Sequence, residues 1–143
     1  MAQEQVCWDD VSEGQEISLQ EPMDSQRLVI WAAASGDYYQ IHYDEGFAKG
    51  TGLDGLIVHG ALKGMLVGRL LDEWTGADGR IVQWGVSYRG MDPLGPDLRV
   101  WAKITKKYEQ DSEARVDLNV GVAQPDGTET TPGTATVILP RRA

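Results

Sequence analysis

Apolar and polar residues alternate with a period of two through most of the second half of the chain. The alternation occupies residues 80–90, 97–108, 113–124 and 133–140, and each run is long enough for a β-strand. Because successive side chains of a strand point to opposite faces, the pattern predicts an antiparallel sheet with one apolar face. The positions expected on that face in the first three runs are Val82, Trp84, Val86 and Tyr88, then Leu98, Val100, Ala102 and Ile104, then Ala114, Val116, Leu118, Val120 and Val122.

Two shorter segments complete the predicted sheet. Residues 124–129 read QPDGTE, and the Asp-Gly pair is typical of a tight hairpin turn, here between the third and fourth runs. Residues 16–21 read EISLQE, which predicts a further strand near the N-terminus.

The first half of the chain has helical spacing instead. Residues 24–35 start with Asp24 or Ser25 as a possible N-cap, and residues 43–52 allow a short helical turn. The strongest helical pattern covers residues 60–74, about 22 Å at ~1.5 Å per residue. Its apolar positions are Leu62, Met65, Leu66, Leu70 and Trp74.

A sheet with one apolar face needs a cover, and the helix over residues 60–74 is the only long, strongly apolar one in the pattern. The predicted fold class is therefore α+β, with a curved antiparallel β-sheet wrapped around a long central helix. A length of 143 residues predicts a single domain over residues 1–143.

Composition narrows the classes of partner. A net charge of −9 argues against nucleic acid and against anionic membrane surfaces. No apolar run approaches the ~20 residues of a membrane span, and the N-terminus lacks a secretory apolar core. The single cysteine, Cys7, excludes an internal disulfide. We therefore expect a cytoplasmic protein that binds neither nucleic acid nor membrane.

The segment SGDYYQIHYD, Ser35–Asp44, holds one of the two histidines. Asp37 and His42 on one short loop can hold a water molecule between them, and a carboxylate beside an imidazole can poise both groups near neutral pH. The alternative is structural: Asp37 caps a turn and His42 satisfies a backbone carbonyl. The spacing leaves both interpretations open.

A second candidate is IVHG, residues 57–60, at the start of the long helix. A helix N-terminus presents free backbone N–H groups and partial positive charge, which suits an oxyanion. A plain helix start with Gly60 in a permissive turn is the alternative, and both interpretations can hold together. His59 is expected to support the site. Two histidines without a cysteine partner or helical H-x3-H spacing predict no metal site.

Residues 32–66 resemble the hydratase signature of the MaoC-like dehydratases, the family of (R)-specific enoyl-CoA hydratases. The signature there is close to SGDxNPIHxD, followed after a short helix by a glycine-containing loop and IxHG. Tyr39 and Gln40 stand where the family usually has Asn-Pro. The resemblance implies a hot-dog fold, which is the arrangement predicted above.

The resemblance also implies a function. It implies addition of water to a trans-2-enoyl thioester, or the reverse, with the water held by Asp37 and His42 and the thioester oxygen bound by the N–H of Gly60. Coenzyme A or an acyl carrier protein would be part of the substrate, and no separate cofactor is expected. The further residues expected to line the substrate site are Ser35, Ile57, Val58, His59, Gly64 and Gly68.

Gly60, Gly64 and Gly68 lie on one helix face because they are four residues apart. They either allow close packing of helix on sheet or line a slot for the substrate. Hot-dog domains resemble one another in pairing edge to edge, so we expect a homodimer or higher homo-oligomer, or a hetero-oligomer with a second hot-dog subunit.

Two other functions are open on this fold. A thioesterase of this fold would resemble enzymes that carry a carboxylate on the central helix. Here the helix carboxylates, Asp72 and Glu73, stand about 18 Å along the axis from Gly60 at ~1.5 Å per residue, so they cannot share a substrate carbonyl with the helix N-terminus. A non-catalytic subunit that binds an acyl thioester is the other, and the presence of both Asp37 and His42 argues against it.

Overall fold

Five antiparallel strands form one sheet in the order β1-β3-β4-β5-β2. The computed structural model describes residues 4–143. Neighbouring strands β3, β4 and β5 are joined by hairpins, whereas β1 and β2 each pair on one side only and form the two edges of the sheet. The strands span Glu16–Glu21 (β1), Arg80–Val86 (β2), Leu98–Gln110 (β3), Glu113–Ala123 (β4) and Glu129–Ile138 (β5).

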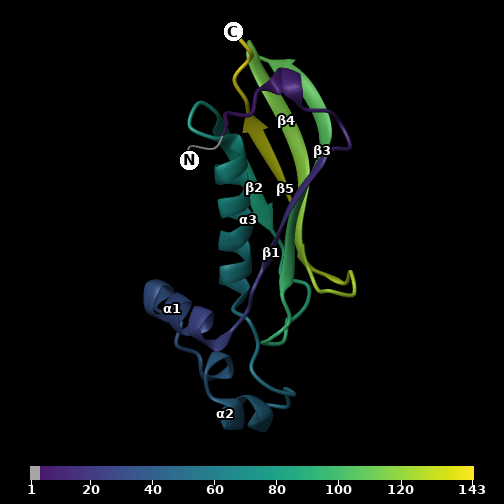
Figure 1. Ribbon diagram of the computed structural model, residues 1–143. Helices are drawn as coiled ribbons and strands as arrows, with labels where there is room; N and C mark the ends of the chain where they lie inside the picture. Colours follow the sequence, from purple (N-terminus) through teal and green to yellow (C-terminus); the bar gives the residue numbers. More distant parts are fainter. Residues whose placement is uncertain (1–3) are drawn as a thin grey trace.

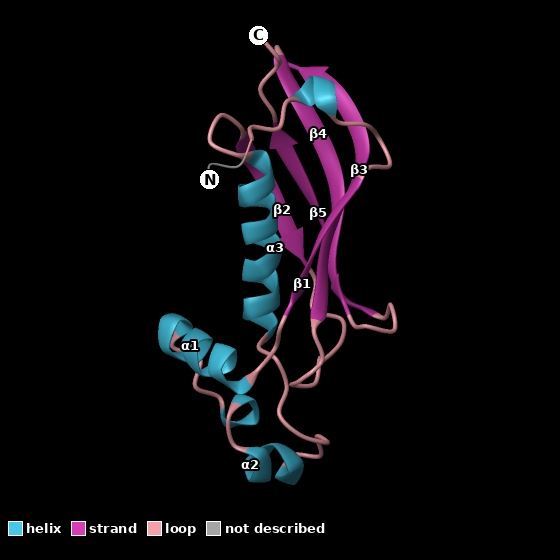
Figure 2. Ribbon diagram, viewed as in Figure 1, coloured by secondary structure: helices cyan, strands magenta, loops and turns pink. Residues whose placement is uncertain are grey.

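The sheet curves around one long helix, α3, which runs along its inner face (Figure 1). Figure 2 shows α1 and α2 beyond the end of the sheet at which α3 begins. Within residues 4–143, no helix is long and apolar enough to cross a membrane. The helices span Ser25–Ser35 (α1), Glu45–Gly50 (α2) and Gly60–Thr75 (α3), with single 3-10 turns at Trp8–Asp10 (η1) and Gln40–His42 (η2).

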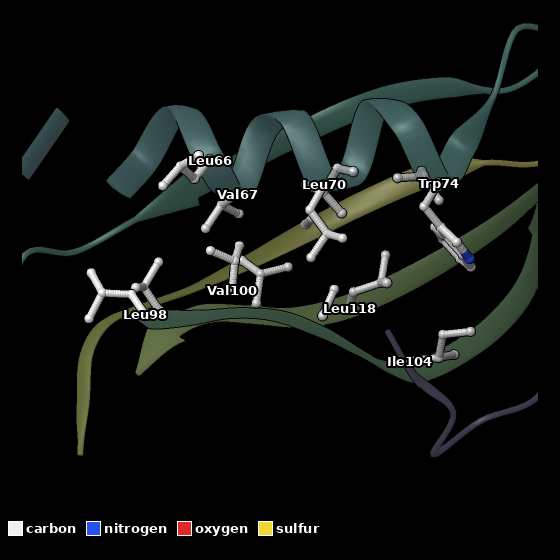
Figure 3. Packing of buried hydrophobic residues seen from close by; sticks show 14 of the residues in the cluster. Leu66, Val67, Leu70, Trp74, Leu98, Val100, Ile104 and Leu118 are labelled. Atoms are coloured by element: carbon white, nitrogen blue, oxygen red, sulfur yellow. The ribbon is translucent and has the colours of Figure 1, made fainter. Parts of the chain in front are cut away.

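The hydrophobic core lies between α3 and the central strands (Figure 3). From the helix, Leu66, Val67 and Leu70 are at most 5% exposed, and from the sheet Val100 and Leu118 are 1% exposed. Burial of each such side chain contributes about 1.5–3 kcal/mol. The apolar stripe predicted for residues 60–74 and the alternating face of the sheet therefore meet, and the predicted α+β hot-dog fold is confirmed.

Local sequence signals place most element boundaries. Asp24 caps α1 by accepting the N–H of Arg27 at 2.8 Å, as expected from a capping aspartate. The strand predicted over residues 16–21 is β1, and it pairs with β3. The hairpin turn between β4 and β5 contains Gly127 at a φ of 88°, a conformation that glycine adopts without steric cost.

The strand predicted over residues 80–90 differs from the observed β2, which ends at Val86. A register shift between Ile81 and Gln83 interrupts its alternation. Val82, Trp84 and Tyr88 are 37%, 40% and 55% exposed instead of buried, because β2 is an edge strand with a neighbour on one side only. The partly buried Ile81 packs against the core.

Candidate active site

Asp37 stands directly beyond the C-terminus of α1. The helix ends at Gly36, which has a φ of 77° and donates its N–H to the carbonyl of Ala32 at 2.9 Å. The hydroxyl of Ser35 donates to the carbonyl of Trp31 at 2.7 Å and accepts the N–H of Asp37 at 3.2 Å. Ser35, expected to bind substrate, therefore orients the backbone that carries Asp37.

The side chain of Asp37 closes the loop that follows it. Oδ1 of Asp37 accepts the N–H of Tyr39 at 3.2 Å, which is the arrangement of an Asx turn. The ring of Tyr39 meets those of His42 and Phe47 edge to face, with centroids 6.4 and 5.9 Å apart. These contacts hold the loop at the position where the family signature has Asn-Pro.

His42 is 7% exposed and has a defined tautomer when neutral. Its Nδ1 lies 2.7 Å from the carbonyl oxygen of Ile57 and must donate, because a carbonyl oxygen only accepts. The lone pair of Nε2 then faces Oδ2 of Asp37 across 3.9 Å. That separation is too long for a direct hydrogen bond, but a water molecule between the two atoms can donate one O–H to each.

The structural alternatives considered for Asp37 and His42 are both present. Asp37 closes a turn with Oδ1, and His42 satisfies a backbone carbonyl with Nδ1. Neither role uses Oδ2 of Asp37 or Nε2 of His42, which are the atoms that face each other. The structural contacts therefore orient the pair and leave the two atoms that face each other without a hydrogen bond between them.

His59 is fully buried and stacks on His42, with ring centroids 3.7 Å apart and an interplanar angle of 20°. Its Nε2 donates to the backbone carbonyl of Asp37 at 3.2 Å, and its Nδ1 is buried without a partner. Burial, and then the charge that His42 can carry, lower the pKa of His59 below its usual value of 6.5. A neutral His59 thus supports both residues of the pair.

Asp37, His42 and His59 are also the one group of potential metal ligands among residues 4–143, with ligand atoms within 4.8 Å of one another. Ligand atoms around a tetrahedral zinc ion lie about 3.4 Å apart, given zinc–nitrogen bonds of ~2.1 Å. The lone pairs of two stacked imidazoles lie in nearly parallel planes, here with ring centroids 3.7 Å apart, so they do not converge on one point. The geometry is therefore poorly suited to zinc, and the expectation of no metal stays a prediction.

Gly60 is the first residue of α3 and lies in the same cavity as His42. The cavity has a volume of about 420 Å³ and is lined by Ile57, Val58 and residues 88–91 as well. One residue of the first motif, His42, and three of the second, Ile57, Val58 and Gly60, therefore line one cavity, whereas Asp37 is not part of its lining. A larger hollow of about 520 Å³ shares Ile57 and Met91 with this cavity, but its lining contains neither His42 nor Gly60.

Gly64 and Gly68 do not line the cavity that contains His42. A Cβ atom added to Gly64 would lie 2.6 Å from the hydroxyl oxygen of Tyr88, and one added to Gly68 would lie 2.9 Å from Cζ2 of Trp84. Both distances are shorter than a van der Waals contact, so the glycines make room for these two aromatic side chains. The structure favours close packing, and a role in substrate binding stays a prediction.

A model of the MaoC like domain matches residues 9–124. The chain belongs to this family. No curated protein sequence matches the chain significantly. Because the match covers both the Asp37–His42 loop and Gly60, it includes all the residues on which the site was predicted.

Solved structures agree with this assignment. R-Hydratase PhaJ1 from Pseudomonas aeruginosa is 23% identical with a TM-score of 0.86, over 96% of this chain and 88% of that one. The (R)-hydratase from A. caviae involved in PHA biosynthesis is 23% identical with a TM-score of 0.80, over 92% and 98%. A chain of the ChsH1-ChsH2 complex from Mycobacterium tuberculosis is 18% identical with a TM-score of 0.77, over 90% and 98%.

At these identities the structural likeness establishes the hot-dog fold of the MaoC-like proteins. Membership of the family, together with neighbours that are R-hydratases, supports hydratase or dehydratase activity for this chain.

A buried ion pair in this MaoC-like domain was not predicted. Lys63 and Asp92 are 2% and 0% exposed, and Nζ of Lys63 lies 2.5 Å from Oδ2 of Asp92. Nζ also donates to the carbonyl of Gly90 at 3.0 Å, and the hydroxyl of Thr130 donates to Oδ2 at 2.8 Å. The charges are therefore compensated within the protein by side-chain and backbone partners.

The ion pair joins the segments that surround the cavity. The carbonyl of Asp92 accepts the N–H of Val58 at 2.9 Å, directly before α3. The carbonyl of Thr130 accepts the N–H groups of Arg89 and Gly90 at 2.9 and 3.1 Å. Lys63 stands four residues after the buried His59 and four before the buried Val67, so helical spacing alone would have placed it on the apolar face.

We expect Lys63→Met to lower the free energy of unfolding by about 3–5 kcal/mol, because it leaves the buried carboxylate of Asp92 without its positive partner. Urea denaturation of the wild type and the variant measures this difference. The double variant Lys63→Met/Asp92→Asn removes the unpaired charge and should recover much of the lost stability. If the double variant loses as much free energy of unfolding as Lys63→Met and Asp92→Asn lose together when measured singly, the two charges do not act as a pair.

The lowered pKa of His59 predicts a pH-dependent stability. The folded protein holds His59 neutral, so the unfolded chain binds more protons near and below pH 6.5. The free energy of unfolding therefore decreases as the pH is lowered through this range. The contribution is fully present above that range. Denaturation of the wild type and of His59→Gln from pH 7.5 to 5.5 should give a shallower slope for the variant. Equal slopes would mean that His59 titrates alike in both states.

Proposed function

We propose that this MaoC-like domain adds water reversibly to a trans-2-enoyl thioester, most simply an enoyl-CoA, and forms an (R)-3-hydroxyacyl thioester. The observation that carries the proposal is the meeting of Nε2 of His42 and Oδ2 of Asp37 across 3.9 Å, beside the cavity that contains Gly60. In this proposal the Asp37–His42 pair accepts a proton and the N–H of Gly60 donates a hydrogen bond, and both act on the same enoyl thioester group.

The water molecule is the nucleophile in this proposal. It donates one O–H to His42 and the other to Asp37, so a lone pair of its oxygen is free to attack C3 of the enoyl group. As the C–O bond forms, the pair takes up one proton of the water, and the C2=C3 electrons move toward the thioester oxygen. The pair then gives this proton to C2 as the electrons return from the thioester oxygen, which completes the addition without any change of oxidation state.

The reaction also requires that the negative charge that develops on the thioester oxygen be stabilised. The backbone N–H of Gly60 at the start of α3 is the proposed donor to that oxygen, aided by the partial positive charge of the helix N-terminus. A Cβ atom at Gly60 would lie only 3.4 Å from the ring of Tyr88. A side chain larger than alanine at this position would therefore have to displace the ring of Tyr88, which lines the same cavity.

Thioester hydrolysis fits the same fold less well. Asp72 and Glu73 are exposed near the C-terminal end of α3, and Glu73 pairs with Arg69 at 3.3 Å. Neither carboxylate approaches Gly60. A non-catalytic subunit that binds an acyl thioester remains the alternative function, and it is separable by assay.

Purified protein mixed with crotonyl-CoA distinguishes the three functions. Loss of the enoyl ultraviolet absorbance without release of thiol indicates hydration, and release of thiol indicates hydrolysis. Binding of the thioester with neither change indicates a binding subunit and would overturn the proposed activity. Chiral analysis of the 3-hydroxy product checks the (R) configuration.

Asp37→Asn and His42→Ala should each lower turnover by a factor of ~10² or more, as expected for loss of a positioned acid or base. The double variant should lose little more than the worse single one, because both groups act on the same water. The exposed Asp54→Asn, which lies outside the cavity, is the matched control and should keep normal turnover. Near-normal turnover of either single variant with intact fold would remove the pair from the mechanism.

We further propose that a second copy of the chain pairs along β2. This edge strand is bonded on one side only, and the exposed Val82 and Trp84 give it an apolar surface. The likeness to a chain of the ChsH1-ChsH2 complex makes a second hot-dog subunit the alternative partner.

Light scattering should report a multiple of 15.7 kDa for the wild type. Val82→Lys places a charge on the proposed edge and should shift the protein toward the monomer, because a buried lysine without a partner opposes pairing. Lys substitution at the exposed Gln83, a polar neighbour on the same strand, is the control. A fully active monomer of the wild type would contradict the pairing.

A further inference from the structure

Tyr39 is the middle one of three exposed tyrosines in the segment between α1 and α2. The other two, Tyr38 and Tyr43, line a cavity of about 350 Å³ beside α1. Tyr39 is not part of that lining, and its ring meets the ring of Phe47 in α2 edge to face, with centroids 5.9 Å apart. The same ring meets His42 with centroids 6.4 Å apart and an interplanar angle of 85°. The ring of Tyr39 therefore links His42 to α2.

The backbone of Tyr39 is bonded to both members of the candidate pair. Its N–H is donated to Oδ1 of Asp37 at 3.2 Å, and its carbonyl accepts the N–H of His42 at 3.1 Å. The first bond leaves Oδ2 of Asp37 as the oxygen that faces Nε2 of His42 across 3.9 Å. A rotation of the backbone at Tyr39 would therefore change the separation of these two atoms, on which the water molecule between them depends.

The stability of the whole domain depends little on this ring. Tyr39 is 53% exposed and lies outside the hydrophobic cluster between α3 and the sheet. Removal of the ring takes little apolar surface out of the core, so the free energy of unfolding should change little. A change in turnover after this removal would then report the arrangement of Asp37 and His42 and not the loss of the fold.

We propose that Tyr39 is a positioning residue: its ring, held against His42 and Phe47, fixes the backbone that sets the distance between Asp37 and His42. This inference rests on the proposed hydratase function and adds to it a residue that acts on the reaction through the pair, without contact to the substrate. Tyr39 and Gln40 stand where the family signature has Asn-Pro. A proline restricts the backbone through its own ring, whereas in this chain aromatic contacts provide the restriction.

The backbone at Gln40 is compatible with proline, which gives a direct test. Gln40 is the first residue of η2, and Tyr39 before it has a φ of −65° and a ψ of 128°, the extended conformation that a residue preceding proline requires. Within residues 4–143, no acceptor receives the N–H of Gln40, so Gln40→Pro removes no hydrogen bond. This substitution can therefore restrict the backbone in place of the Tyr39 ring.

Steady-state kinetics with crotonyl-CoA measure the effect on the reaction. Tyr39→Ala should lower kcat about ten-fold and leave KM nearly unchanged, because misplacement of a reacting group slows the chemical step and not binding. Tyr39→Phe keeps the ring contacts and should keep normal kcat, and Tyr39→Ala/Gln40→Pro should recover most of the loss. Tyr38→Ala is the matched control, since Tyr38 is similarly exposed, at 59%, and lines the cavity beside α1 instead.

Four results would each overturn the inference. They are normal kcat in Tyr39→Ala, an equal loss in Tyr39→Phe, an equal loss in Tyr38→Ala, and no recovery in the double variant. Gln40→Pro alone should keep normal kcat. Loss of activity in that variant would mean that the loop does not have the conformation on which the inference is built, and would overturn it as well. Thermal unfolding should give nearly the same Tm for Tyr39→Ala and the wild type.

Amide hydrogen exchange measured by NMR separates this inference from the proposed activity, because it needs no turnover. The N–H of His42 is bonded to the carbonyl of Tyr39. Tyr39→Ala should speed its exchange about ten-fold, as expected for the loss of two aromatic contacts, and Gln40→Pro should slow it again. If exchange responds in this way but the wild type does not hydrate crotonyl-CoA, the proposed function fails and Tyr39 still holds the pair. If hydration occurs but exchange at His42 is unchanged in Tyr39→Ala, the function stands and the inference is overturned.

Discussion

The buried ion pair between Lys63 and Asp92 is the constraint that sets the shape of the site. A charge in the interior is tolerated only when its partner and its hydrogen bonds are in place. Lys63 belongs to the first turns of α3, Asp92 to the segment after β2, and Thr130 to β5, so one set of bonds fixes three elements. Apolar contacts allow small sliding movements, whereas these directional bonds do not. The position of Gly60 relative to His42 depends on them, because Val58 is bonded to the same Asp92.

Local sequence patterns were sufficient to predict the sheet, the central helix and the pair of candidate residues. Alternation over residues 113–124 and helical spacing over residues 60–74 report directly which face of each element is buried. Asp37 and His42 lie on one short loop, so their proximity follows from the chain itself. The resemblance to the MaoC-like family added the meeting of that loop with Gly60, which spacing alone does not determine.

Contacts between distant segments were beyond local patterns. Nothing within a window of residues indicates that Lys63 pairs with Asp92, and a lysine in a helix is ordinarily solvated. The aromatic side chains that lie against the glycine row come from β2 and the residue two beyond its end, after a register shift that the alternation of residues 80–90 does not reveal. The cavity beside α1 depends on how the loop with Tyr38 and Tyr43 returns toward the helix. Each of these features requires the three-dimensional arrangement.

The segment that carries Asp37 and His42 lies beyond the end of the sheet, outside the main core (Figure 1). In α1 and α2 only Leu28, Ala32 and Ala48 are buried, and hydrogen bonds such as that from the N–H of Leu94 to Leu56 tie the segment to the body. Regions with little buried apolar surface open at lower free energy than the core. Order in the candidate site and global folding are therefore separate thermodynamic properties of this molecule. Sequence changes that strengthen the sheet and α3 stabilise the fold without protecting the arrangement of Asp37 and His42.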